Sequence, residues 1–173
     1  MARCLAGDPA AFEPLVGRYE AVLFRVALRL TGEYEDARDA TQNAFVKAFE
    51  QLHRYDRNRK FFSWIYRIAV NECLNLRRSR RPQEALTEGA DTRSGPFEAC
   101  VQAEARSRID RAMAGLSFEY REVIALRHFA DLSYEEMADA IGVPEKTVKS
   151  RLFSARQKLA VLLRMARDTN DGE

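Results

Sequence analysis

Apolar side chains recur at intervals of three and four residues along most of the chain, and this period predicts helices. In the first segment, eight apolar positions share one helix face: Phe12, Leu15, Val16, Tyr19, Leu23, Val26, Ala27 and Leu30. Thr31-Gly32 then breaks the pattern. A second helix is expected to place Ala37, Ala40, Ala44, Phe45, Ala48 and Leu52 inward, opposite a polar face with Asp36, Asp39, Gln42, Asn43 and Lys47. The start of the chain therefore predicts two helices that pack through an alanine-rich face.

A polar loop, Tyr55 to Lys60 (YDRNRK), separates the second helix from a third one of about Phe61 to Arg78. The third helix has two apolar stripes. One contains Phe62, Ile65, Ala69, Cys73 and Leu76, and the other contains Phe61, Trp64 and Ile68. This pattern fits either a helix with two buried faces or an exposed aromatic platform beside a basic end.

The segment from Pro82 to Pro96 (PQEALTEGADTRSGP) has almost no large apolar residue, and it is expected to be a flexible linker. Helical patterns resume near Phe97, break at Ser117 and continue to Phe129. The sequence thus predicts an all-α protein of two small helical domains, residues 1–81 and 104–167. A flexible linker is expected at 82–103 and a disordered tail at 168–173.

The second domain carries the pattern of a helix-turn-helix. Ser133-Tyr-Glu-Glu136 has the form of a capping box. The short helix that it begins places Met137, Ala138 and Ile141 inward and ends at Gly142, a residue that readily adopts the left-handed conformation of a sharp turn. Pro144 suits the first turn of the last helix, whose inward positions are Val148, Leu152, Ala155 and Leu159. The combination of Ala138, Gly142 and Val148 is typical of DNA-binding helix-turn-helices.

The opposite face of the last helix carries hydrogen-bond donors and one aromatic side chain: Lys146, Thr147, Lys149, Ser150, Arg151, Phe153, Ser154 and Arg156. Donors on a recognition helix reach base edges, and flanking cations bind phosphates. An amphipathic helix with a basic surface is the plainer alternative. The net charge of only +2 conceals this patch and a second one at Arg77, Arg78, Arg80 and Arg81. Two basic patches favour a polyanion that is contacted in two places.

Other classes of function find little support. Cys4, Cys73 and Cys100 match neither a disulfide framework nor a zinc pattern, and we expect reduced thiols with Cys73 buried. His53 and His128 stand in no catalytic or metal-binding spacing, and no phosphate-binding glycine loop is present. Neither an enzyme nor a cofactor is therefore expected. Because no apolar run approaches the roughly 18 residues of a membrane span, we expect a cytoplasmic protein without membrane insertion.

Two segments resemble a known family. LSYEEMADAIGVPEKTVKSRLFSARQKL (Leu132–Leu159) is similar to the fourth conserved region of extracytoplasmic-function sigma factors, the compact group of the sigma-70 family. EDARDATQNAFVKAF (Glu35–Phe49) and FSWIYRIAVNECLN (Phe62–Asn75) resemble the second conserved region of that family. The resemblance covers about residues 5–81 and 104–163, in the family's order. It implies a subunit that binds core RNA polymerase, directs it to specific promoters and helps to melt the minus-ten region.

The resemblance also implies three sets of contact residues. Contacts to the clamp helices of the largest polymerase subunit would come from Asp36, Asp39, Gln42, Asn43 and Lys47. The minus-ten element would be read by Tyr55, Arg57, Asn58, Lys60, Phe61, Trp64, Arg67, Asn71 and Asn75, although Phe61 and Trp64 fit core packing equally well. The minus-thirty-five element would face Lys149, Ser150, Phe153 and Ser154, with Thr147 beside them and Lys146, Arg151 and Arg156 near phosphates.

The implied partners are the polymerase, through its clamp helices and its flap, promoter DNA and an anti-sigma factor. Phe45, Phe49, Trp64 or Leu163 could contact the anti-sigma factor. The sequence departs from the family pattern where Arg38 and Asn43 replace frequent acids and where Ser154 replaces a usual Arg. A stand-alone transcriptional regulator with the same helix-turn-helix is an alternative, and a purely protein-binding helical module is another. The regulator would bind promoter DNA without polymerase.

Overall fold

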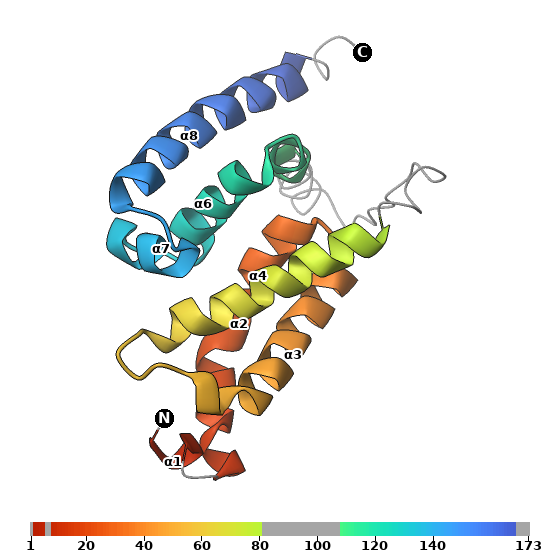
Figure 1. Cartoon of the computed structure of the whole chain (residues 1–173). Coiled ribbons are helices and arrows are strands. Elements are labelled where there is room, and N and C mark those ends of the chain that lie inside the picture. Colours follow the sequence, from red (N-terminus) through yellow and green to blue (C-terminus); the bar gives the residue numbers. More distant parts are fainter. Residues whose placement is uncertain (1, 6–7, 81–107, 169–173) are drawn as a thin grey trace.

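A computed structural model describes residues 2–5, 8–80 and 108–168 of the chain (Figure 1). The predicted linker at 82–103 lies outside the described residues, as do Arg81, Cys100 and most of the predicted tail. Within the described part, every regular element is a helix. No described helix is both long enough and apolar enough to cross a membrane. The all-α prediction is therefore confirmed.

The first group of helices contains α1 (Ala2–Leu5), α2 (Glu13–Thr31), α3 (Tyr34–Glu50) and α4 (Phe61–Arg80), with short 3-10 helices at Pro9–Ala11 and Leu52–Arg54. Helix α2 ends where Gly32 adopts a φ of 85° and its N–H donates to the Leu28 carbonyl. Four alanines of α3 are fully buried: Ala37, Ala40, Ala44 and Ala48. Because alanine has only a methyl side chain, α3 can lie close to both α2 and α4.

Cys73 occupies this core as the sequence predicts. Its side chain is fully buried, and burial raises the pKa of the thiol to about 12. A thiol with this pKa has almost no thiolate at neutral pH and is therefore unreactive. Cys73 contributes to packing as a small apolar residue.

The second group contains a helical segment at residues 108–114, followed by α6 (Phe118–Phe129), α7 (Tyr134–Ile141) and α8 (Glu145–Asp168). The predicted capping box is present, because Ser133 Oγ accepts from the Glu136 N–H and the Glu136 carboxylate accepts from the Ser133 N–H. Gly142 ends α7 with a φ of 78°. Val148, Leu152 and Ala155 of α8 are fully buried. The helix-turn-helix inferred from sequence is thus α7, its turn and α8.

The two groups of helices pack against each other. Helix α2 lies against α6, and α4 lies against α7, so that the second group covers one side of the first (Figure 1). The sequence predicts two domains but not this contact. The contact places α7 of the helix-turn-helix against α4, the helix that follows the YDRNRK loop.

Candidate nucleic-acid interface

The loop from Tyr55 to Lys60 is held by its own hydrogen bonds. The Tyr55 hydroxyl donates to the Arg59 carbonyl over 2.5 Å, and the Asp56 carboxylate accepts from the Asn58 N–H over 2.9 Å. The side chains of Arg57 and Asn58 are exposed at the tip. A loop held in one shape presents its donors in a defined direction, which favours recognition of a specific ligand.

An aromatic cluster supports this loop. The rings of Tyr55, Phe61 and Trp64 lie with centroids 5.2 to 5.8 Å apart. Phe61 is 7% exposed and belongs to the core, whereas Trp64 is only partly buried. The structure therefore favours core packing for Phe61 over contact with a base. Trp64 and Tyr55 keep part of their surface accessible, as a stacking platform requires.

The face of α4 beyond the loop continues the polar surface. Asn71 and Asn75 are exposed, at a spacing of four residues that places them on the same side of the helix. Arg67 lies one turn before Asn71, but its guanidinium donates to the Asp139 and Ala140 carbonyls of α7 over 2.5 and 3.1 Å. Of the predicted minus-ten residues, Asn71 and Asn75 are thus exposed on α4, Phe61 is buried, and Arg67 is in contact with α7.

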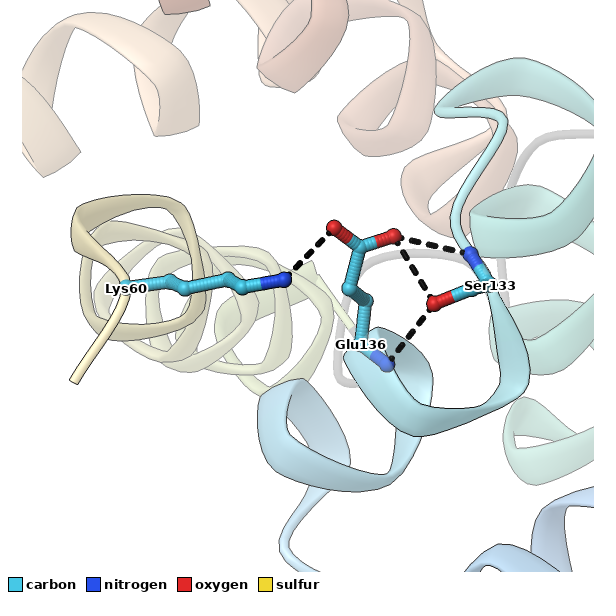
Figure 2. Close-up of polar contacts among 3 residues, drawn as sticks. All are labelled: Lys60, Ser133 and Glu136. Atoms are coloured by element: carbon cyan, nitrogen blue, oxygen red, sulfur yellow. Dashed lines mark hydrogen bonds and ion pairs between the residues drawn. The ribbon is translucent and has the colours of Figure 1, made fainter.

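Lys60, at the end of the loop, also contacts α7. Figure 2 shows its ammonium directed at the Glu136 carboxylate, with Nζ 2.8 Å from Oε1, while Ser133 holds the other carboxylate oxygen. The hydrogen bond from Lys60 and those from Ser133 lower the pKa of Glu136 to about 2. Glu136 is therefore ionised at any physiological pH. One side chain both caps α7 and binds a predicted DNA-contact residue.

The exposed side of α8 is the second polar surface. Lys146, Lys149, Ser150 and Arg156 are exposed, and Phe153 is 64% exposed although it is a large aromatic residue. The remaining predicted residues, Thr147, Arg151 and Ser154, are partly buried. An exposed aromatic ring among cations and hydroxyls is typical of a helix that enters a DNA groove, where apolar groups contact the thymine methyl. Lys149 is oriented by Glu145, 2.6 Å away, and by the ring of Tyr134.

The structure corrects one residue of the predicted polymerase surface. Asp36 is only 7% exposed and faces the interior of the first group. Its spacing of four from the buried Ala40 places both on the same side of α3. Asp39, Gln42 and Asn43 are exposed, as expected. Lys47 is partly buried and forms an ion pair with Glu72 of α4 at 2.7 Å.

Beside this polar face lies an apolar groove between α2 and α3 with a volume of about 610 Å³. Its lining includes Phe24, Tyr34, Phe45 and Val46, together with polar residues such as Gln42. Tyr34 and Val46 are more than half exposed. Among the described residues, no cluster of histidine, cysteine or acidic side chains has the arrangement of a metal site.

Two family models match the two groups of helices. Residues 15–83 match region 2 of the sigma-70 proteins, and residues 106–159 match region 4. The chain is 32% identical to the extracytoplasmic-function sigma factor SigW of Bacillus subtilis, with 91% of each protein covered. It is 30% identical to the sigma-H factor of Pseudomonas aeruginosa and 32% identical to the sigma-E factor of Escherichia coli, over 91% of this chain and 88% of each relative.

The chain belongs to the extracytoplasmic-function sigma factors of the sigma-70 family. As a sigma factor, it acts with RNA polymerase in promoter-specific initiation of transcription. The family resemblance inferred from the sequence motifs is therefore confirmed.

Solved structures agree with this fold. The structure of CnrH, in complex with the cytosolic domain of CnrY, superimposes with a TM-score of 0.73 at 29% identity and covers 95% of this chain and 94% of that one. The sigma factor RpoE, in complex with the anti-sigma factor NepR from Bartonella quintana, gives a TM-score of 0.71 over 89% of this chain and 97% of that one. At 23% identity, the likeness to RpoE concerns the fold alone.

The contact between the two regions of this sigma factor includes buried polar groups that the sequence analysis missed. The hydroxyl of Tyr66 in α4 donates to the Glu122 carboxylate of α6 over 2.9 Å, with Tyr66 1% and Glu122 7% exposed. Arg121 donates to the Leu30 carbonyl of α2 over 3.0 Å. The local pattern of Tyr120-Arg121-Glu122-Val123 does not show that region 2 supplies the partners.

The raised pKa of Glu122 predicts that the packing of the two regions depends on pH. Burial raises the pKa of this carboxyl, and Glu119 acts in the same direction, whereas the Tyr66 hydrogen bond and Arg151 lower it less. A raised pKa means that the contribution of Glu122 to stability is complete below the ordinary carboxyl pKa and is lost as pH rises through the folded value. Glu122→Gln should therefore raise the urea midpoint at pH 7, and the gain should disappear near pH 4. An equal gain at both pH values would contradict this.

Proposed function

We propose that this sigma factor contacts its polymerase and promoter through three described surfaces. The exposed face of α3 with Asp39, Gln42 and Asn43 would bind the clamp helices of the largest polymerase subunit. The loop and α4 would bind the melted strand of the minus-ten element. The exposed face of α8 would enter the major groove at the minus-thirty-five element.

One observation carries the assignment to DNA. Two separate surfaces combine an exposed cation with an accessible aromatic side chain: Arg57 with Trp64, which packs on Tyr55 of the same loop, and Lys149 with Phe153 one turn further along α8. Cations bind phosphates, and aromatic rings stack on unpaired bases or contact base methyl groups. The first surface lies on a loop and a helix start, which suits a single strand, while the second lies along one helix, which suits a duplex groove.

The region boundaries follow the same division. We propose that residues 1–81 form the unit that binds polymerase and the minus-ten element, and that residues 104–167 form the unit that binds the minus-thirty-five element. The polymerase carries out the chemistry of RNA synthesis, while the sigma factor supplies binding energy that stabilises the open promoter.

An anti-sigma factor is the proposed regulatory partner. CnrH was solved in complex with the cytosolic domain of CnrY, and the Bartonella RpoE in complex with the anti-sigma factor NepR. In this chain, the apolar groove between α2 and α3, with Tyr34 and Val46 exposed, offers a surface for such a partner next to the proposed polymerase contact. Of the residues proposed for this contact from sequence, Phe49 is 45% exposed, whereas Phe45 is 7% exposed.

Run-off transcription tests the proposed function. Core bacterial polymerase and fragmented DNA of the source genome would be incubated with and without the protein. Discrete transcripts that require the protein are expected. Tight sequence-specific DNA binding by the protein alone, without transcripts, would instead support the stand-alone regulator.

Asp39→Ala tests the polymerase surface directly. Asp39 is exposed, and its 3.9 Å separation from Arg38 Nε gives it only a loose ion pair. Loss of a charge at a protein interface is expected to weaken binding to core polymerase roughly fivefold or more, without a change in stability. The measurement is a titration of labelled core polymerase. Glu13→Ala, an exposed acid in the first turn of α2, is the matched control. Equal losses in both variants would contradict a role for this face of α3.

A further inference from the structure

A histidine and an arginine meet beside the proposed recognition surface of α8. His128 lies in the last turn of α6, and Arg156 lies in α8. The Arg156 Nη2 atom is 3.4 Å from His128 Nε2, and both side chains are exposed. Arg156 already belongs to the proposed DNA surface, whereas the proposed contacts leave His128 without a role.

Arg156 shares the face of α8 that carries Lys149 and Phe153. It lies seven positions after Lys149, which is close to two helical turns and about 10 Å along the helix axis. The N-terminal part of a recognition helix reaches the base edges, and the major groove is about 12 Å wide. A group that far along the helix therefore lies near the strand that borders the groove. The pair of His128 and Arg156 is placed to meet the DNA backbone.

The surroundings of this pair are positively charged. Partial burial of the ring lowers the pKa of His128 most, and the charges of Arg156 on α8 and Arg127 on α6 lower it further. The Arg127 guanidinium is held by the Leu132 carbonyl over 2.8 Å. Within the described part of the chain, no acid forms an ion pair with either arginine. A group of cations without an acidic partner favours the binding of an anion.

The contact between the two side chains defines the protonation state of the imidazole in the free protein. A guanidinium has only donors, so Arg156 donates and His128 Nε2 accepts. The ring is then neutral, with its proton on Nδ1. A protonated ring would donate from both nitrogens, and the two side chains would then both need an acceptor. A phosphate oxygen is such an acceptor and supplies the missing negative charge.

We propose that His128 and Arg156 form a proton-linked site for one backbone phosphate of the minus-thirty-five duplex. A proton from solvent adds to His128 Nε2 as the phosphate binds, and the Nε2–H and the Arg156 guanidinium both donate to phosphate oxygens. This inference rests on the proposed function, because it requires α8 to enter the major groove. It adds a residue of α6 to the contacts of the recognition helix.

The proposal gives DNA binding a pH dependence of known sign. The phosphate favours the protonated ring, so the pKa of His128 is higher in the complex than in the free protein. The added affinity is fully present below the pKa of the free protein and is lost as pH rises through the pKa of the complex. DNA therefore binds more tightly as pH falls.

Duplex affinity at two pH values tests this linkage. The full chain would be titrated at pH 6 and pH 8, in low salt, into a rhodamine-labelled random-sequence duplex of about 20 base pairs, and fluorescence anisotropy would report binding. Wild type is expected to bind roughly two- to fivefold more tightly at pH 6, as one additional exposed ion pair would produce. The slope of log affinity against log salt should steepen by about 0.9 at pH 6, because one more phosphate is neutralised.

His128→Gln removes the titrating ring but keeps a polar side chain, and it should lose most of the pH dependence and the change in salt slope. His53→Gln is the matched control, because it removes the other of the two histidines, which is also exposed. It should retain the wild-type behaviour. His128→Lys carries a fixed charge and should bind at pH 8 nearly as tightly as wild type does at pH 6.

The difference between wild type and His128→Gln decides the outcome. Glu122 also has a raised pKa, and its titration contributes equally to both proteins. An affinity of wild type that is the same at both pH values, or too weak to detect, would overturn the proposal. The same follows if His128→Gln keeps the full pH dependence, or if His53→Gln loses it.

Titration of the histidine ring by NMR distinguishes DNA from a free anion. The Cε1–H signals are assigned from the two glutamine variants. Saturating duplex should raise the pKa of His128, whereas inorganic phosphate at matched ionic strength should raise it much less, because only DNA is also held by the other contacts of α8. An equal rise with both would show a general anion site and would overturn the assignment to DNA. An unchanged pKa with saturating duplex would overturn the site itself.

Lys149→Glu in the same duplex assay separates this inference from the proposed function. If Lys149→Glu binds more weakly and His128→Gln keeps the wild-type pH dependence, α8 binds DNA and the proton-linked site is wrong. If Lys149→Glu binds the duplex as tightly as wild type, α8 is not the DNA surface, and the inference fails with the proposed function. Weaker binding by Lys149→Glu together with lost pH dependence in His128→Gln supports both.

Discussion

Arg121→Met is expected to lower the free energy of unfolding by about 3 kcal/mol, since an unpaired buried polar group costs about 1–3 kcal/mol. The Arg121 guanidinium donates to the carbonyls of Leu30, Ala114 and Leu116 at 3.0 to 3.2 Å. Methionine fills similar space without donating to any of them. The expected loss is below the sum of three such costs, because burying the charge is itself unfavourable and Arg121 Nε has no hydrogen-bond partner.

Urea denaturation followed by circular dichroism gives this free energy. Arg111→Met, on the exposed side of the helical segment at 108–114, removes the same charge at the surface and should change stability by less than about 0.5 kcal/mol. Because Leu30 belongs to α2, Arg121→Met should also loosen the contact between the two regions. A loss no larger than that of Arg111→Met would show that the three hydrogen bonds contribute little.

Lys149→Glu is expected to reduce promoter-dependent transcription roughly 10- to 100-fold, because a good contact to a base edge contributes about 1–3 kcal/mol of discrimination and the new charge repels phosphate. Lys149 lies on the exposed side of α8, where Glu145 and the Tyr134 ring orient its ammonium. The side chain is exposed, so the fold should be retained. Run-off transcription at saturating core polymerase provides the measurement.

Lys158→Glu provides the matched control. Lys158 is exposed on the same helix, nine positions and about two and a half turns further on, and so lies on the opposite side. The Lys158→Glu substitution makes the same change in net charge, but residue 158 does not face the proposed DNA groove. Similar losses in the two variants would indicate a general electrostatic effect, and normal transcription by Lys149→Glu would argue against the recognition surface on α8.

Local sequence patterns predicted the helices and their ends with little error. The Ser133–Glu136 capping box and the left-handed Gly142 both appear as inferred, because the atoms that make them lie within a few residues of one another. The inward faces of α3 and α8 also follow their apolar periodicity. Such features depend on a helix period and on turn chemistry, both of which a single sequence displays.

The same periodicity was less informative where a polar residue borders an apolar face. Asp36 was predicted on the polymerase surface but is buried beside Ala37 and Ala40. Phe61 fitted both core packing and contact with a base, and only the packing of Tyr55 and Trp64 around it distinguishes these roles. In both residues, burial is decided by neighbouring helices. The residue type alone therefore did not determine whether these side chains are buried.

The sequence by itself determined the all-helical fold, the two regions, the helix-turn-helix and the family, because each depends on short-range periodicity or on contiguous motifs. Only the tertiary structure decided that Lys60 meets Glu136, that Arg67 meets the end of α7 and that Tyr66 meets Glu122. These partners are more than fifty residues apart in the chain. Their contact depends on how two separately patterned units pack together, and no local repeat encodes that arrangement.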